Sequence, residues 1–241
     1  MTQNPDRRSS AYETQGWAVF SDILHPSLRN SAVKWIHAAE ARAGEDSALE
    51  PEFEPETLKG QLSVRKLRRL LWNDTPFWTD WLAQSGILEL GASFIRGEPA
   101  VVFQAAFLKP GIIGSKVALH QDQALWTYDY PKAVSVWIAL SNSTQRNGCL
   151  KLCPGSHLRG LIPHRSDPKY PWHPCLDPDL DSLPAAQEIP MAQGDVLVWH
   201  RYMVHGSEAN VSGEDRIGMV VVFVDAAASN FKAKDILRVK I

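Results

Sequence analysis

The sequence predicts an α+β fold that is mainly β, with a jelly-roll (double-stranded β-helix, cupin-like) core and N-terminal helices packed outside it. Helical patterns occur before residue 100, whereas later apolar runs are short and rich in β-branched or aromatic residues. The loops between these runs differ in length, which favours a jelly roll over a parallel sheet. The 241 residues suit a single domain over 1–241.

The composition is that of an ordinary soluble protein and excludes several partners. Hydrophobic residues make up 44% and charged residues 22%, and the net charge is −2, so a basic nucleic-acid-binding face is not expected. The sequence shows no apolar run long enough to cross a membrane and no signal-peptide core at its start. Three cysteines are too few for a disulfide framework. We therefore expect a cytoplasmic protein without nucleic-acid or membrane partners, while the oligomeric state is not indicated.

The N-terminal third begins with a polar stretch, residues 1–15, which is expected to be a loose leader. A short apolar strand is predicted over 17–20. A helix is predicted over 26–42, because its apolar residues recur at spacings of three and four. The segment 43–63 is acidic and contains prolines, which indicates a solvated loop, with a lid or a partner surface as the alternative.

Three further helical segments are expected before residue 100. Residues 64–72 look helical and basic, Thr75-Pro76 marks a helix start, and Ser85 precedes another apolar run that ends at Gly97.

Five strands are predicted in the second half of the chain, each bounded by Gly, Pro, Asn or Ser. They cover residues 101–108, 134–140, 150–153, 196–199 and 217–224. The stretch 157–190 contains seven prolines and no strong element, so it is expected to form a lid loop over the open end of the barrel.

A candidate metal site is formed by His120, Asp122 and His205. Side chains at i and i+2 of a strand share a face, so His120 and Asp122 can reach one ion. Two imidazoles and one carboxylate make the facial triad of non-haem Fe(II) oxygenases, whereas zinc prefers a closed tetrahedron or three ligands plus water. The His-x-Asp pattern alone is also typical of a polar strand face.

Arg216 stands at the start of an apolar strand, where burial of a guanidinium is costly unless it is paired. A planar guanidinium that binds a carboxylate through two hydrogen bonds offsets this cost. The carboxylate that suits an Fe(II) oxygenase is the distal one of 2-oxoglutarate.

Longer motifs surround these residues. They are GWAVFSDILHPS at 16–27, HQD at 120–122, SVWIALSNSTQRNGCLKLCPGSH at 135–157 and GDVLVWHRYMVHGS at 194–207. With Arg216, they make the chain resemble the phytanoyl-CoA dioxygenase family of Fe(II)- and 2-oxoglutarate-dependent oxygenases over residues 16–225. The resemblance implies that His120, Asp122 and His205 are the catalytic iron ligands, that Arg216 anchors 2-oxoglutarate, and that O2 is the oxidant.

The resemblance also implies roles for several other residues. Gln104 and Trp137 are expected beside the co-substrate, although a register slip would turn Gln104 away and Trp137 could simply pack in the core. Trp126 and Trp199 are expected to line the substrate, with core packing as the alternative. Relatives often carry a serine two residues after the arginine, but this chain has Gly218, so a second hydrogen bond to the carboxylate must come from elsewhere.

The function expected from these residues is oxidation of a small organic molecule, by hydroxylation or a related C–H oxidation, in natural-product biosynthesis. An acyl-CoA or another primary metabolite is the alternative substrate, with the basic residues 65–69 as a phosphate contact. A non-catalytic relative that binds a small ligand is a further alternative. A cupin-type metal-dependent hydrolase or isomerase is another, and it would not need Arg216.

Overall fold

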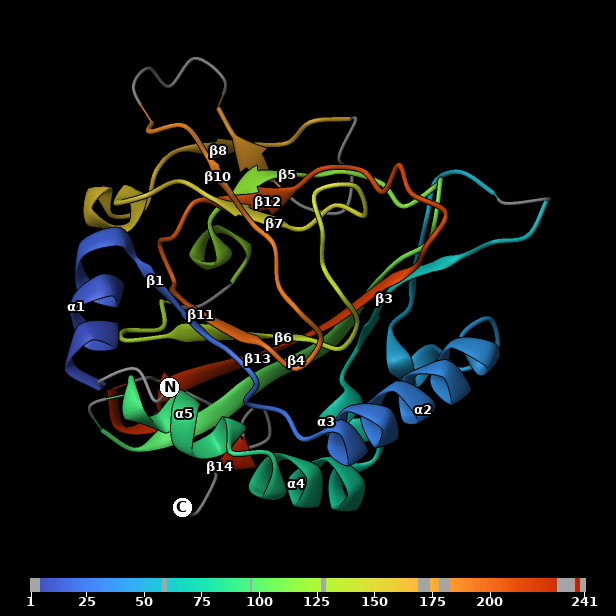
Figure 1. The fold of residues 1–241 in the computed structure, drawn as a ribbon, viewed down its shortest axis with the longest axis horizontal. Helices are drawn as coiled ribbons and strands as arrows, with labels where there is room; N and C mark the ends of the chain where they lie inside the picture. Colours follow the sequence, from blue (N-terminus) through green and yellow to red (C-terminus); the bar gives the residue numbers. More distant parts are fainter. Residues whose placement is uncertain are drawn as a thin grey trace.

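The computed structural model describes residues 5–57, 60–95, 97–126, 129–168, 174–177, 183–228 and 237–238. Two antiparallel sheets face each other, and the helices α2 to α5 lie on the outer side of the larger one (Figure 1). This arrangement confirms the mainly β jelly-roll fold with outer helices. Within the described part of the chain, no helix has the length and apolar character needed to cross a membrane.

The large sheet has the strand order β1-β11-β6-β13-β4-β3-β2, with β14 paired to β4. Its strands are β1 (Trp17–Phe20), β2 (Glu52–Phe53), β3 (Val64–Arg68), β4 (Pro99–Lys109), β6 (Val134–Ala139), β11 (Val196–His200), β13 (Arg216–Asp225) and β14 (Leu237–Arg238). The small sheet has the order β10-β7-β12-β5. Its strands are β5 (Val117–His120), β7 (Leu150–Leu152), β10 (Gln187–Ile189) and β12 (His205–Ser207), while β8 (His164–Arg165) pairs with β9 (Cys175–Leu176). All five strands predicted in the second half are present.

The helices are α1 (Pro5–Gln15), α2 (Pro26–Arg42), α3 (Leu70–Asn73), α4 (Thr75–Gln84) and α5 (Ile87–Ser93). Short 3-10 turns are η1 (Ser47–Leu49), η2 (Asp122–Leu125), η3 (Ser156–Arg159) and η4 (Ala226–Ala228). Helix α2 covers the predicted range, because Pro26 suits its first turn and its buried positions recur every three or four residues: Ala32, Ile36 and Ala39.

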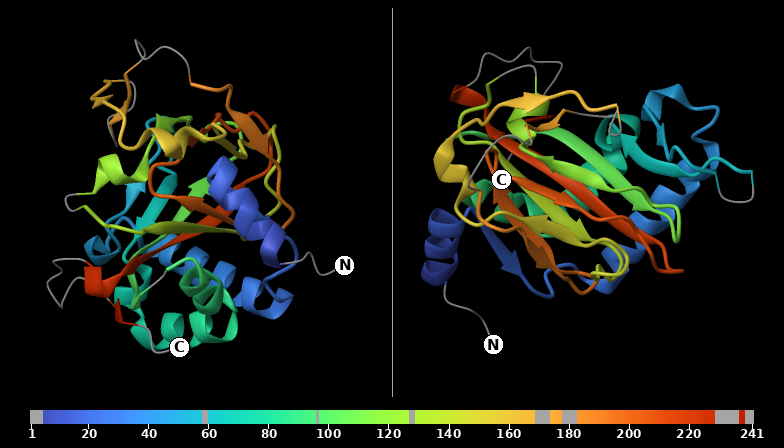
Figure 2. Two further views of the ribbon diagram at one scale, coloured as in Figure 1. Left: turned by 90° about the vertical axis from the view of Figure 1, so that its left-hand side faces the viewer. Right: turned by 90° about the horizontal axis from the view of Figure 1, so that it is seen from above.

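Both faces of the large sheet are buried, which explains its long apolar strands. All ten residues of β13 are buried. Val221 belongs to the cluster that packs against the outer helices, and its neighbour Val220 belongs to the cluster between the two sheets. Strands buried on both faces carry continuous apolar runs instead of alternating ones. Figure 2 shows the two sheets from two further sides. Residues of both sheets line the pocket that forms the candidate site.

Two N-terminal expectations are wrong. Residues 5–15 form helix α1 instead of a loose leader, because Tyr12 packs on Phe94 with ring centroids 4.8 Å apart. Residues 64–68 form strand β3 instead of a helix, because they pair with β4 on one side and with β2 on the other. Glu52 of β2 lies 2.9 Å from a guanidinium nitrogen of Arg65, which reduces the cost of placing cations in a sheet.

The segment 157–190, expected to be a lid loop, contains η3, β8, β9 and β10. Residues 169–173 and 178–182 within it lie outside the described residues. Its role as a lid stays a prediction.

Candidate active site

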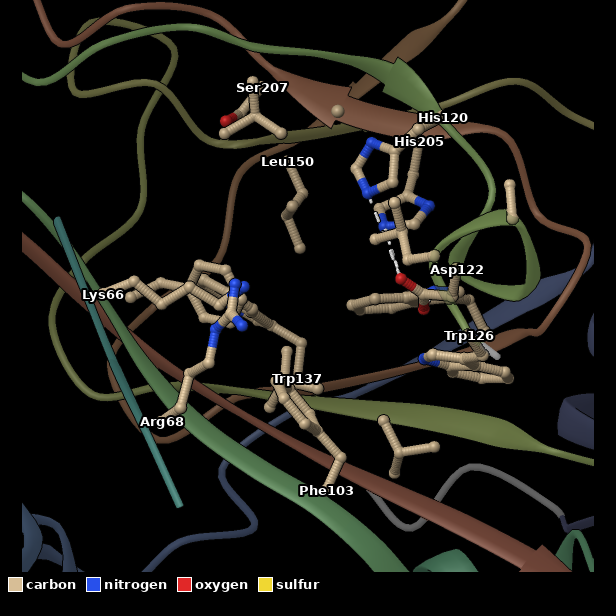
Figure 3. Close-up of a pocket in the computed structure, with 18 of the residues that line it drawn as sticks. Lys66, Arg68, Phe103, His120, Asp122, Trp126, Trp137, Leu150, His205 and Ser207 are labelled. Carbon is tan, nitrogen blue, oxygen red and sulfur yellow. Dashed lines mark hydrogen bonds and ion pairs between the residues drawn. The ribbon is translucent and has the colours of Figure 1, made fainter. Parts of the chain in front are cut away.

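The three predicted metal ligands come together on the small sheet. His120 ends β5, His205 begins the neighbouring strand β12, and the two residues are paired in register. Asp122 lies in the turn η2, just after β5, and its Oδ1 atom is 3.5 Å from His205 Nε2 and 4.0 Å from His120 Nε2. All three ligand atoms lie within 4.8 Å of one another, so one ion can contact all of them (Figure 3).

Backbone carbonyl groups orient both histidines. His120 Nδ1 lies 2.8 Å from the oxygen of Ala118, and His205 Nδ1 lies 2.9 Å from the oxygen of Met203. Each ring therefore donates its hydrogen from Nδ1 and keeps the Nε2 lone pair for a metal.

The carboxylate of Asp122 is oriented as well. Its Oδ2 atom accepts hydrogen bonds from Ser135 Oγ at 2.5 Å and from Trp199 Nε1 at 2.9 Å. These bonds leave Oδ1 facing the histidines, so the carboxylate can offer the metal a single oxygen. A set of two imidazoles and one such carboxylate, with open positions beside it, fits Fe(II).

The triad lies at one side of a pocket of about 760 Å³ between the two sheets. Aromatic side chains form much of its wall: Phe103, Phe107, Trp126, Tyr130, Trp137 and Trp199. Trp126 and Trp199 thus lie where the sequence placed them, along the pocket. Trp199 also holds Asp122, a role that sequence reasoning missed.

Arg216 lines the same pocket and is almost fully buried, at 3% exposure. It donates to the carbonyl oxygen of Gly148, and its guanidinium carbon lies 5.1 Å from the centre of the Trp137 ring. Among the described residues no carboxylate forms an ion pair with it, and its Nε has no hydrogen-bond acceptor. Burial lowers the pKa of Arg216 to about 10.

Trp137 lies beside Arg216, and its indole nitrogen is a second buried donor without an acceptor in the described part of the chain. Two buried donors that lack acceptors suit an incoming carboxylate, because such groups are costly to leave unpaired. The residues present therefore fit the distal carboxylate of 2-oxoglutarate.

The glycine at position 218 makes room for this indole. A Cβ atom added there would lie 1.9 Å from Trp137 Cζ2, so a serine cannot occupy the position while Trp137 lies across β13. Ser207 is another hydroxyl along the pocket. The sequence analysis did not identify Ser207, although residues two apart in a strand lie on the same face and Ser207 is two residues after His205.

Gln104 does not lie where the sequence placed it. In register it is opposite Val221, and its Nε2 atom lies 3.2 Å from Met219 Sδ, in the apolar cluster on the helix side of the large sheet. The neighbouring Phe103 and Phe107 line the pocket. A strand has a period of two, so Gln104 turns away from the pocket.

Three cations of β3 line the pocket: Arg65, Lys66 and Arg68. Lys66 and Arg68 lie across from the triad (Figure 3). Lys66 Nζ lies 4.9 Å from the centre of the Phe107 ring and 3.7 Å from Glu52 Oε1. Burial lowers the pKa of Lys66 to about 8. The basic residues were seen in the sequence, but their place beside the pocket depends on β3 being a strand.

Comparisons with known proteins identify the family of the chain. The sequence model of the family described as phytanoyl-CoA dioxygenase (PhyH) matches residues 12–218. Phytanoyl-CoA dioxygenase 1 of Oryza sativa subsp. japonica is 28% identical over 233 residues, which cover 92% of this chain and 79% of the rice protein. Phytanoyl-CoA dioxygenase domain-containing protein 1 of Mus musculus is 31% identical over 179 residues, or 69% of this chain and 59% of the mouse protein. The chain thus spans less than two thirds of the mouse protein.

Solved structures share the fold. The non-heme alpha ketoglutarate dependent carbocyclase SnoK from nogalamycin biosynthesis matches with a TM-score of 0.72 and 20% identity, over 93% of this chain and 85% of SnoK. EctD from S. alaskensis, solved with 2-oxoglutarate and 5-hydroxyectoine, matches with a TM-score of 0.74 and 19% identity, over 93% of this chain and 77% of EctD. Since the family model covers most of the chain and the triad is assembled in the structure, the chain belongs to the phytanoyl-CoA dioxygenase family of Fe(II)- and 2-oxoglutarate-dependent oxygenases.

Proposed function

We propose that the protein uses Fe(II), 2-oxoglutarate and O2 to oxidise a C–H bond of a small organic molecule, by hydroxylation or a related reaction, in natural-product biosynthesis. The observation that carries the proposal is that the triad and Arg216 line one pocket. A non-catalytic relative would not need a complete triad, and a cupin-type hydrolase or isomerase would not need a buried arginine at this place.

Each group of the pocket has a task in this reaction. When bound, iron and 2-oxoglutarate supply the oxidising power. His120, His205 and Oδ1 of Asp122 would hold the metal, and Arg216 and Trp137 would hold the distal carboxylate of the co-substrate. The aromatic walls exclude water and orient the substrate, which protects a reactive site from side reactions.

The aromatic lining favours a substrate with an apolar body, and SnoK, which shares the fold, comes from nogalamycin biosynthesis. A second candidate is a substrate with an anionic group, such as an acyl-CoA. It is favoured by Lys66 and Arg68 along the pocket. The three cysteines are buried and unpaired, which supports the expected cytoplasmic location.

Succinate formation tests the proposal, with the Fe(II)-loaded protein and a panel of polycyclic natural products and acyl-CoA thioesters. His120→Ala and His205→Ala should abolish turnover and leave the circular dichroism spectrum unchanged. His37→Ala, at a histidine whose side chain is 53% exposed, is the control. Wild-type turnover in either triad variant would exclude the site.

Arg216→Ala should raise the KM for 2-oxoglutarate by one to two decades. A charge-assisted contact of this kind contributes roughly 1.5–3 kcal/mol. The KM for the organic substrate should change far less. An unchanged KM for 2-oxoglutarate would move the anchor to another residue.

A further inference from the structure

Lys109, the last residue of β4, crosses from the large sheet to the small sheet beside Arg216. The two residues are paired in register on neighbouring strands. The Lys109 ammonium donates to Ser207 Oγ at 2.8 Å and to the carbonyl oxygen of Glu208. Lys109 is 3% exposed, and burial together with the nearby Arg216 charge keeps its pKa well below the ordinary lysine value.

Two glycines leave room for this side chain. A Cβ atom added to Gly114 would lie 2.4 Å from Lys109 Cγ, and one added to Gly148 would lie 3.1 Å from Lys109 Nζ. The carbonyl oxygen of Gly148 also accepts from Arg216, so both cations lie against the same wall. An anion between the sheets at this point would offset their mutual repulsion.

The hydrogen bond from Lys109 to Ser207 determines where the Ser207 hydroxyl hydrogen can point. A hydroxyl has one hydrogen to donate, and the Lys109 nitrogen is the donor both to Ser207 Oγ and to the Glu208 carbonyl oxygen. Because Ser207 Oγ accepts from Lys109, the Ser207 hydrogen must point to a different atom. No acceptor for it lies within hydrogen-bond distance in the described ranges, and Ser207 lines the pocket on the same strand face as His205.

We propose that Lys109 is a positioning residue for the co-substrate: its ammonium holds Ser207 so that the hydroxyl hydrogen points into the pocket, toward the carboxylate that Arg216 holds. The inference rests on the proposed function, because 2-oxoglutarate supplies that carboxylate. The alternative is that Lys109 only links the two sheets.

Binding measurements separate these roles. We would titrate the Co(II)-loaded protein with 2-oxoglutarate and with 2-oxovalerate, which has the same chain length and keto acid but ends in a methyl group. Lys109→Met should weaken 2-oxoglutarate binding at least tenfold and leave 2-oxovalerate binding within twofold of wild type. Equal losses for both ligands would show a purely structural role and overturn the proposal.

A double-mutant cycle tests the path through Ser207. Ser207→Ala should also weaken only 2-oxoglutarate binding, and adding Lys109→Met to it should cause little further loss. Losses that multiply would overturn the proposal, because Lys109 would then act independently of Ser207. Lys116→Met, at a half-exposed lysine nearby, is the control.

Two further variants keep the test decisive. Lys109→Gln retains a polar end in the same wall and replaces the methionine variant if that variant does not fold. It should likewise weaken 2-oxoglutarate binding and leave 2-oxovalerate binding near the wild-type value. Arg216→Ala monitors the proposed function in the same assay. If Arg216→Ala leaves 2-oxoglutarate binding unchanged, the proposed function fails, whereas an effect of Arg216→Ala without one of Lys109→Met overturns only the role of Lys109.

Discussion

Trp199 and Ser135 both donate hydrogen bonds to the same oxygen of Asp122. They come from the neighbouring strands β11 and β6, where they are paired in register, so the large sheet orients the Asp122 carboxylate of the turn η2. Partners of this kind usually affect metal affinity strongly, because they fix the direction of the ligand lone pair.

Trp199→Phe should therefore weaken Co(II) or Fe(II) binding by roughly 10- to 100-fold, while the aromatic wall of the pocket is kept. Titration of the Co(II) absorption bands measures the affinity. Trp126→Phe is the matched control, since the Trp126 ring packs on Tyr130. Equal affinities in wild type and Trp199→Phe would show that Ser135 alone orients the carboxylate.

His200 is a residue outside the pocket with a clear pH signature. Burial, with smaller contributions from His157 and Arg201, lowers the pKa of His200 from 6.5 to about 4. Its Nδ1 atom accepts a hydrogen bond from the Tyr202 backbone N–H, which requires the neutral ring. The neutral form thus contributes stability that is present above pH 6.5 and lost as the pH falls toward 4.

Accordingly, the free energy of unfolding of the wild type should decline more steeply between pH 6.5 and pH 4 than that of His200→Gln. Urea unfolding at several pH values measures this slope. His37→Gln, at an exposed histidine, is the control substitution. Parallel curves for wild type and His200→Gln would contradict the assignment.

At the scale of elements, β13 combines the proposed co-substrate anchor with a tight crossing of Trp137. The strand begins at Arg216, and two residues later Gly218 lets the indole lie against the backbone. The position of the Trp137 indole beside Arg216 therefore depends on the absence of a side chain at Gly218 of β13.

Gly218→Ala should overpack this crossing and lower the free energy of unfolding by about 1–3 kcal/mol. It should also weaken 2-oxoglutarate binding, because Trp137 must move away from Arg216. Thermal unfolding and titration measure the two effects. Gly44→Ala, where a Cβ meets nothing within 4 Å, is the control, and a wild-type Tm for Gly218→Ala would contradict the packing argument.

At the scale of the whole molecule, the site joins the two sheets. The proposed metal ligands come from the small sheet and the turn after β5, whereas Arg216 comes from the large sheet. In the proposed function, a metal and co-substrate bound together would contact both sheets, and they could do so only in the folded chain.

Co(II) with 2-oxoglutarate should accordingly raise the Tm. At 100 times the dissociation constant, the stabilisation is about 2.7 kcal/mol, which corresponds to roughly 5–10 °C in a chain of this size. Differential scanning calorimetry measures the shift, and EDTA should reverse it. His205→Ala should show little shift, and an equal shift in that variant would place the metal elsewhere.

Much of the fold could be predicted from the sequence. Helix α2 and the buried strands β4, β6, β11 and β13 follow from local patterns, because a helix period or a dense apolar run is visible without knowledge of distant residues. The grouping of His120 with Asp122 also depends on near neighbours.

Tertiary structure alone decided the rest. Residues 64–68 form a strand because they pair with β4 and β2. Residues 5–15 form a helix that packs on the rest of the chain through the contact of Tyr12 with Phe94. Gln104 faces away from the pocket because the register between β4 and β13 sets which face it takes. Lys109 and Ser207 meet only because two sheets stack. These features depend on contacts between residues far apart in the chain, and such contacts leave no local period in the sequence.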